Sequence, residues 1–191
     1  MTYIELIVVL SIFSATASIV MFNYGDFQAK VDIKNLTSDI ALKIVEAQKE
    51  SLSGRLPPRT TVPTWKPSYG IYMNIASDNK SFIYFTDLDQ NGRLANPNCA
   101  GTSECLDKIS ITKGNYIDII NRCSNVNCSS GAPIANPLAI TFKRPDSKAI
   151  FYQGSSPLNL TGSEYVQITV KSPNLSTAKI KVYPSGRIQV D

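Results

Sequence analysis

The first 22 residues carry a single charge, Glu5, whereas the whole chain of 191 residues has 19 Lys and Arg and 15 Asp and Glu. Sixteen of these 22 residues are hydrophobic. Residues 6–22 are uncharged and would form about 25 Å of α-helix, slightly less than the hydrocarbon thickness of a bilayer. We therefore expect this segment to span a membrane with mild thinning, or to pack among other apolar helices. A secretory signal peptide is disfavoured, because no basic stretch precedes the apolar run and there is no A-x-A site followed by a break in the helical pattern.

A second helical pattern extends from the apolar segment to residue 53. Its hydrophobic residues recur at three- and four-residue spacing on one face: Ile33, Leu36, Ile40, Ile44 and Ala47, with Ala29 and Ala41 beside them. Gly54 is a typical residue for a helix C-terminus, and Pro57 and Pro58 cannot continue a helix. A continuous helix over residues 1–53 would be about 80 Å long. This length predicts one half in a membrane or among other subunits, and the other half against the chain's own sheet.

A local interruption of this helix is one expectation for residues 14–25. Gly25 costs about 1 kcal/mol relative to alanine in a helix interior. Ser14, Thr16 and Ser18 lie just upstream, and such side chains can bond to the backbone and bend apolar helices. The sequence predicts either a bend or melted turn in this stretch or, equally, an unbroken curved helix.

Alternating hydrophobicity replaces the helical period from residue 69 onward. Nine segments bounded by Gly, Pro, Asn, Asp and Ser are predicted as β-strands: 69–75, 81–86, 108–112, 116–120, 138–143, 148–153, 164–171, 178–183 and 187–190. We therefore predict an α+β fold in which a long N-terminal helix packs on an antiparallel, β-rich globular head. The expected division is a hydrophobic helix over 1–24, an amphipathic helix over 25–54 and the head over 55–191.

The chain contains no histidine, which excludes Ser-His-Asp and Cys-His catalysis and histidine-ligated metal sites. It also has no phosphate-binding loop and no paired carboxylates on a recognisable catalytic scaffold. We expect a protein that is not an enzyme.

The opening residues Met1-Thr2-Tyr3-Ile4-Glu5 and the apolar run after them resemble the mature N-terminus of the type IV pilin superfamily. That pattern is Phe or Met, Thr, two apolar residues, Glu at the fifth position and an apolar segment. The resemblance implies that Met1 follows the cleavage site of prepilin peptidase and carries an N-methylated amine. It also implies that Glu5 pairs with the N-terminal amine of a neighbouring subunit, beside the hydroxyl of Thr2, since a buried carboxylate is costly unless paired. The alternative is a Glu5 side chain that reaches the lipid interface.

The resemblance further implies a structural subunit of a type IV pilus. Such a subunit is held in the cytoplasmic membrane by a single span until the pilus assembly machinery polymerises it. The product is an extracellular homo-oligomeric filament that serves adhesion, motility or DNA uptake. The expected head is similar to that of H-type pseudopilins and related minor pilins, so a minor pilin and a type II secretion pseudopilin remain alternatives.

A DNA-binding minor pilin is a further alternative. The motif of that group, Gly-Arg-x-Arg, is half present here, because Arg187 follows Gly186 but Gln189 stands where the second Arg belongs. The small excess of positive charge predicts only a weak, salt-sensitive attraction to phosphate.

The four cysteines are Cys99, Cys105, Cys123 and Cys128. Their spacings differ from the C-x2-C pattern of zinc sites, and no histidine could complete such a site. Because an exported domain lies in an oxidising compartment, two disulfides are expected. Of three possible connectivities we favour local pairing, Cys99 with Cys105 and Cys123 with Cys128.

Residues 87–93 form the one metal-like constellation in the sequence. Asp87, Asp89 and Asn91 place side-chain oxygens on alternate positions, as in the first half of an EF-hand calcium loop. Gly92 suits the sharp turn, and Arg93 would offer its carbonyl.

The second half of an EF-hand loop is missing. Its twelfth position, which requires a bidentate Glu, is Asn98 here. Glu104 or Asp107 would have to supply the missing oxygens by folding back. The sequence leaves open a calcium site and a polar turn in which Asp and Asn cap their own backbone.

Overall fold

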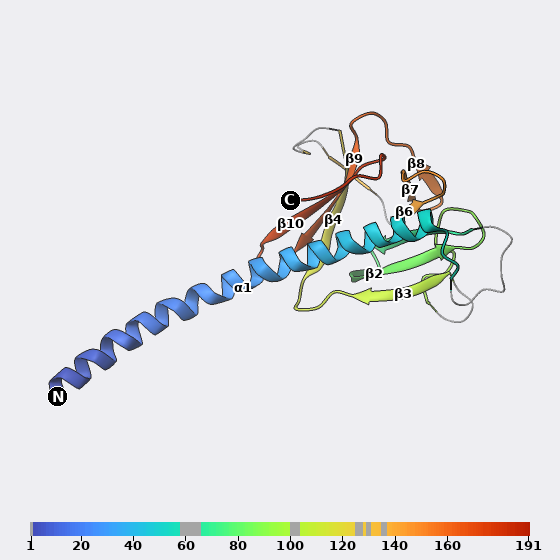
Figure 1. Ribbon diagram of the computed structural model, residues 1–191. Coiled ribbons are helices and arrows are strands. Elements are labelled where there is room, and N and C mark those ends of the chain that lie inside the picture. Colours follow the sequence, from blue (N-terminus) through green and yellow to red (C-terminus); the bar gives the residue numbers. More distant parts are fainter. Residues whose placement is uncertain (1, 58–65, 100–103, 125–127, 129–130, 135–136) are drawn as a thin grey trace.

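The structure is a computed structural model that describes residues 2–57, 66–99, 104–124, 128, 131–134 and 137–191, with the backbone alone for 22 and 23. One long helix, α1 (Tyr3–Ser53), leads into a head of antiparallel strands. Figure 1 shows the second part of the helix lying along the head, while the first part extends away from it. The predicted α+β architecture is thus confirmed.

Helix α1 is unbroken through the stretch where we expected an interruption. All residues from Tyr3 to Ser53 are helical, including Gly25, and the helix curves gently (Figure 1). Thr16 Oγ1 donates to the Ile12 carbonyl at 3.1 Å, and Ser18 Oγ donates to the Ser14 carbonyl at 2.9 Å. These hydroxyls bond back to the helix without opening it. The melted turn is therefore wrong, and the alternative of an unbroken curved helix is correct.

The helix ends where the sequence predicted. Gly54 adopts the left-handed conformation (φ 64°, ψ 37°), and its N–H bonds back to the carbonyls of Glu50 and Ser51. Glycine adopts this conformation without the steric cost of a Cβ, which explains the residue type at this position.

Eleven strands form two antiparallel sheets within the described residues. They are β1 (Ser68–Asn74), β2 (Asp78–Asp87), β3 (Cys105–Ser110), β4 (Tyr116–Cys123), β5 (Ala132–Pro133), β6 (Leu138–Phe142), β7 (Ala149–Gln153), β8 (Ser156–Leu158), β9 (Tyr165–Lys171), β10 (Thr177–Val182) and β11 (Ile188–Val190). One sheet has the order β3-β2-β1-β6-β7-β8, and the other has the order β11-β10-β9-β4-β5. All nine predicted strands are present, and the short edge strands β5 and β8 were missed.

The main hydrophobic core joins α1 to both sheets. The helix contributes Ile33, Ile40, Ala41, Ile44 and Ala47, with Leu36 half-buried beside them. The sheets contribute alternate residues, such as Ile71 of β1 and Ile168 of β9, each fully buried. The predicted apolar face of the helix is therefore the face that packs on the head, with Ala29 half-buried at its start.

Polar contacts tie the same part of α1 to the head. Ser51 Oγ donates to the carbonyl of Phe142 at 2.6 Å in a buried position. Gln48 donates to the carbonyls of Ser147 (2.8 Å) and Gly186 (3.1 Å). Nearer the middle of the helix, Lys113 forms an ion pair with Asp32 at 2.6 Å.

A second, smaller core lies on the other face of the first sheet. It consists of Ile83, Phe85, Leu94, Cys105 and Ala139, with Tyr72, Cys99 and Tyr152 packed against it. Leu94 and Cys99 belong to the connection between β2 and β3, so this connection covers the outer face of the sheet.

Candidate functional site

The first part of α1, which we call the projecting half (residues 3–25), makes no packing contact with the head. All its residues with described side chains are exposed. They include thirteen large hydrophobic side chains: Tyr3, Ile4, Leu6, Ile7, Val8, Val9, Leu10, Ile12, Phe13, Ile19, Val20, Met21 and Tyr24. A contiguous apolar surface of this size marks an interaction with other proteins or with a membrane.

By length and composition, α1 could cross a membrane, and its most apolar window has no residue buried in the structure. The remainder of the helix, which we call the docked half (residues 26–53), carries the residues buried against the head. The membrane-compatible segment and the head-binding segment are therefore successive parts of one continuous helix.

Thr2 and Glu5 together cap the start of α1. Thr2 is the N-cap residue, and its hydroxyl accepts a hydrogen bond from the Glu5 N–H at 3.4 Å. The Glu5 carboxylate in turn accepts one from the Thr2 N–H at 3.3 Å through Oε2. This reciprocal arrangement is a capping box, which satisfies backbone N–H groups that lack helical partners. We missed this role, although the spacing Thr-x-x-Glu is its sequence signature.

Met1 and Arg187 were also proposed from the sequence as functional residues. Met1, the expected bearer of the paired amine, lies outside the described residues. Arg187 is exposed, and its guanidinium lies 3.9 Å from the centre of the Tyr183 ring. A cation over an aromatic face is attracted by the ring electrons, so Arg187 is engaged by its own hairpin.

Acidic residues from the two ends of the β2–β3 connection lie close together. Asp87 is the last residue of β2, and Glu104 directly precedes β3. The carboxylates of Asp87, Asp89 and Glu104 lie within 4.8 Å of one another. Of the two residues that the sequence proposed for folding back, Glu104 joins the cluster. Asp107 is exposed on β3 and is not a member of it.

Backbone N–H groups hold this cluster in place. Glu104 accepts hydrogen bonds from the N–H groups of Leu88 (2.9 Å), Asp89 (3.3 Å) and Ala95 (2.9 Å). Asp87 Oδ2 accepts one from the Gly92 N–H at 3.0 Å. These bonds fold the start of the connection into a compact loop around the carboxylates.

Asn91, Gly92 and Arg93 shape the loop in different ways. The Asn91 side chain donates to Asp89, and its oxygen accepts from the Arg93 N–H at 2.7 Å. Gly92 has a φ of 77°, and a Cβ there would lie 2.4 Å from the ring of Tyr152. Its carbonyl accepts a buried hydrogen bond from Thr141 at 2.7 Å. Glycine at this position is therefore required both by the turn and by close packing on the sheet.

The carboxylate of Asp87 is in an unusual environment. Asp87 is 3% exposed and Glu104 is 6% exposed, whereas Asp89 faces solvent. The pKa of Asp87 is raised to about 6, mainly by burial and in addition by contact with Asp89 and the charge of Glu104, against the lowering effect of the Gly92 N–H. Among the described residues, no ion pair involves Asp87, Asp89 or Glu104.

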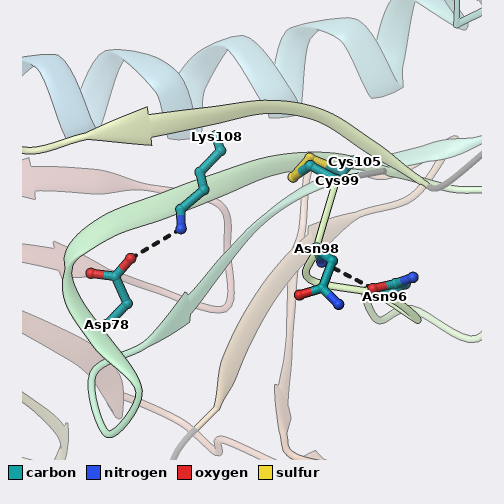
Figure 2. The surroundings of a disulfide bond; sticks show 6 residues. All are labelled: Asp78, Asn96, Asn98, Cys99, Cys105 and Lys108. Atoms are coloured by element: carbon teal, nitrogen blue, oxygen red, sulfur yellow. Dashed lines mark hydrogen bonds and ion pairs between the residues drawn. A yellow bond between two sulfur atoms is a disulfide. The ribbon is translucent and has the colours of Figure 1, made fainter. Parts of the chain in front are cut away.

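Two disulfides occur with the favoured local pairing, Cys99–Cys105 and Cys123–Cys128. Figure 2 shows Cys99 of the β2–β3 connection held against Cys105 at the start of β3. Further along β3, Lys108 reaches Asp78 of β2 at 3.1 Å. The first disulfide therefore fixes the connection next to Glu104.

No known protein family, curated protein or solved structure matches the chain. The N-terminal pattern, the exposed apolar helix and the acidic loop are therefore the features on which a functional assignment rests.

Proposed function

We propose that the chain is a structural subunit of a type IV pilus or a closely related pilin-like filament. The projecting half of α1 anchors it in the cytoplasmic membrane and then forms the core of the extracellular filament. The observation that carries this proposal is the uncovered apolar surface of residues 3–25, which begins at the Thr2–Glu5 pattern of the pilin superfamily.

The energetic reason is the cost of leaving these side chains in water. Removing one large aliphatic or aromatic side chain from water stabilises by about 1.5–3 kcal/mol. The projecting half exposes thirteen of them. Lipid covers such a surface before assembly, and the helices of neighbouring subunits cover it in a helical array.

Glu5 sets the position of one subunit against the next. Its Oε2 is used by the capping box, while Oε1 accepts no hydrogen bond from the described residues. The carboxylate therefore keeps an acceptor for the N-terminal amine of a neighbour. In the apolar filament core this pairing offsets the cost of burying both charges.

Minor pilins and type II secretion pseudopilins use the same helix, so they are alternatives within the proposal. The abundance of the subunit in surface filaments distinguishes them, because a major pilin forms the bulk of the filament. We do not extend the proposal to DNA binding, since Arg187 packs on Tyr183 and a glutamine replaces the second arginine.

The test is the production of surface filaments by cells that carry variants of this chain. Glu5→Gln removes the charge but keeps a residue type that completes a capping box. We expect electron microscopy to find no filaments with Glu5→Gln, while the variant chain accumulates, folded, in the membrane. Sequencing the subunit of wild-type filaments identifies whether this chain forms them.

Two controls separate the charge from the cap. Thr2→Ala weakens the capping box and keeps the carboxylate, so filaments persist in reduced number. Glu46→Gln changes a glutamate of the docked half and leaves filament yield unchanged. Normal filament yield from Glu5→Gln would refute the proposed role of Glu5.

A further inference from the structure

The connection between β2 and β3 is long for a compact domain. It runs from Leu88 to Glu104 without regular secondary structure in its described residues. Loops of this length inside a folded domain usually carry a function of their own. The disulfide Cys99–Cys105 closes its second part, and the acidic cluster gathers its first part against the end of β2.

A buried oxygen in the cluster has no partner. Asp87 is 3% exposed, and its Oδ1 accepts no hydrogen bond, although Oδ2 accepts one from Gly92. Oδ1 belongs to a carboxylate that lies within 4.8 Å of those of Asp89 and Glu104. A buried polar atom without a partner costs free energy that native proteins avoid.

The negative charges of the cluster also lack a partner of opposite charge among the described residues. Three carboxylates converge, and none of them forms an ion pair with a Lys or Arg among the described residues. Buried charges are normally paired with opposite charges or bound to metal ions. A bound cation would partner these carboxylates, including the unpartnered Oδ1 of Asp87.

We propose that Asp87, Asp89 and Glu104 bind a Ca²⁺ ion at the start of the β2–β3 connection. The donor set consists of hard oxygens, which suit Ca²⁺. Asp89 is exposed and opens the site to solvent, whereas Asp87 and Glu104 form its buried floor. Ca²⁺ accepts irregular arrangements of oxygen ligands, whereas Mg²⁺ requires nearly ideal octahedral geometry and releases its water reluctantly.

An ion bound at this site would stabilise the β2–β3 connection, which covers the second, smaller core. Glu104 holds the N–H groups of Leu88 and Ala95, on either side of the turn. Leu94, directly before Ala95, is buried in that core against the sheet. Binding of Ca²⁺ therefore fixes the loop on the sheet, together with the disulfide that ties Cys99 to Cys105 next to Glu104. This inference does not depend on filament assembly.

The experiment measures binding of Ca²⁺ to the full chain in detergent, after removal of divalent ions with a chelator. Calorimetric titration with CaCl₂ is expected to give one site, with a dissociation constant of about 0.1–1 mM, as in extracellular calcium modules. At a free Ca²⁺ concentration about tenfold above this constant, linkage predicts a rise of about 3–6 °C in the unfolding midpoint. An equal rise with MgCl₂ would overturn the assignment to calcium.

We choose the variants according to how exposed each of the three carboxylates is, because a substitution of an exposed ligand disturbs the fold least. Asp89→Asn changes a solvent-facing ligand, so the head remains folded, and we expect affinity to fall about tenfold or more. Asp87→Asn and Glu104→Gln are expected to abolish the calcium-dependent rise in the unfolding midpoint. Asp107→Asn is the matched control, because this residue lies three positions from Glu104 outside the cluster, and its affinity is expected to stay at the wild-type value.

Two results contradict the site. One is the absence of heat and of any midpoint shift with millimolar Ca²⁺ in the wild-type chain. The other is a loss of affinity in Asp107→Asn as large as that in Asp89→Asn, which would indicate general attraction of cations to acidic residues. Either result would leave the cluster as a hydrogen-bonded turn that caps its own backbone.

Discussion

The two halves of α1 are parts of one unbroken helix but differ in what covers them. The projecting half (residues 3–25) is apolar on all sides and exposed, whereas the docked half (residues 26–53) is amphipathic and buries one face. A single apolar stripe is enough to dock a helix on a sheet. A helix that is apolar all round needs partners on every side, which the head of one chain does not provide. This difference is the basis of our proposal that lipid or other subunits cover the projecting half.

The same substitution in the two halves tests this difference most strongly. Ile44 is fully buried in the docked half, and Ile12 is 60% exposed in the projecting half. Ile44→Ala is expected to lower the free energy of unfolding of the head by about 2–5 kcal/mol, because it leaves a cavity in the core. Ile12→Ala is expected to change it by no more than about 0.5 kcal/mol.

Urea unfolding of the full chain in detergent, followed by near-ultraviolet circular dichroism, measures both effects. Equal losses of stability in the two variants would show that the projecting half also contributes to folding of the head. That outcome would break the distinction between the two halves.

A buried hydrogen bond at the end of the docked half gives a smaller effect. Ser51 donates to the Phe142 carbonyl inside the core, whereas Ser53 donates only to its own helix at the surface. Ser51→Ala leaves a buried carbonyl without its donor, so we expect a loss of about 1–3 kcal/mol. Ser53→Ala is the matched control, with an expected change of no more than about 0.5 kcal/mol. Thermal unfolding compares the two, and a loss in Ser53→Ala as large as in Ser51→Ala would contradict the assignment.

Acid is expected to have the smallest effect, through one ion pair between the docked half and the head and another within the head. A hydrogen bond from Lys113 holds the pKa of Asp32 below its ordinary value, and Arg122 lowers the pKa of Glu164 to about 2. A carboxyl with a lowered folded pKa stabilises the fold above its unfolded pKa, and this contribution disappears as pH falls through the folded pKa. Stability should therefore decline from about pH 4.5 toward pH 2.

Variants assign this decline to the two pairs. Glu164→Gln is expected to remove the part of the acid dependence that arises within the head. Asp32→Asn is expected to remove the part that arises from the ion pair between the helix and Lys113, in the turn between β3 and β4. Unfolding midpoints measured between pH 2 and pH 6 provide the comparison. An unchanged slope in both variants would show that other carboxyls control the acid response.

Much of the fold follows from hydrophobic periodicity. The three- and four-residue spacing of Ile33, Ile40 and Ile44 predicted the docked face, and period-two alternation predicted nine strands. The strands β5 and β8 have two and three residues, too few for alternation to be recognised. Pro133 in β5 also argues against a strand except at a sheet edge, which is where β5 lies.

Three features of the helix and the sites were not fully predicted from the sequence. Gly25 suggested an interruption, but one glycine costs only about 1 kcal/mol, and the helical segments on both sides continue through it. The capping role of Glu5 was readable from Thr-x-x-Glu and was missed in favour of an intermolecular role. The choice of Glu104 over Asp107 depends on how the loop folds back on β2, which residue spacing does not determine.

The central claim is that the projecting half of α1 forms the core of a filament. Electron cryo-microscopy of filaments isolated from cells that produce this chain tests it most directly. The account predicts that residues 3–25 of neighbouring subunits pack together along the filament axis, with Glu5 beside the N-terminal end of an adjacent chain and the heads outside. Filaments in which the heads make the contacts and residues 3–25 face solvent or lipid, or filaments without this chain, would contradict it.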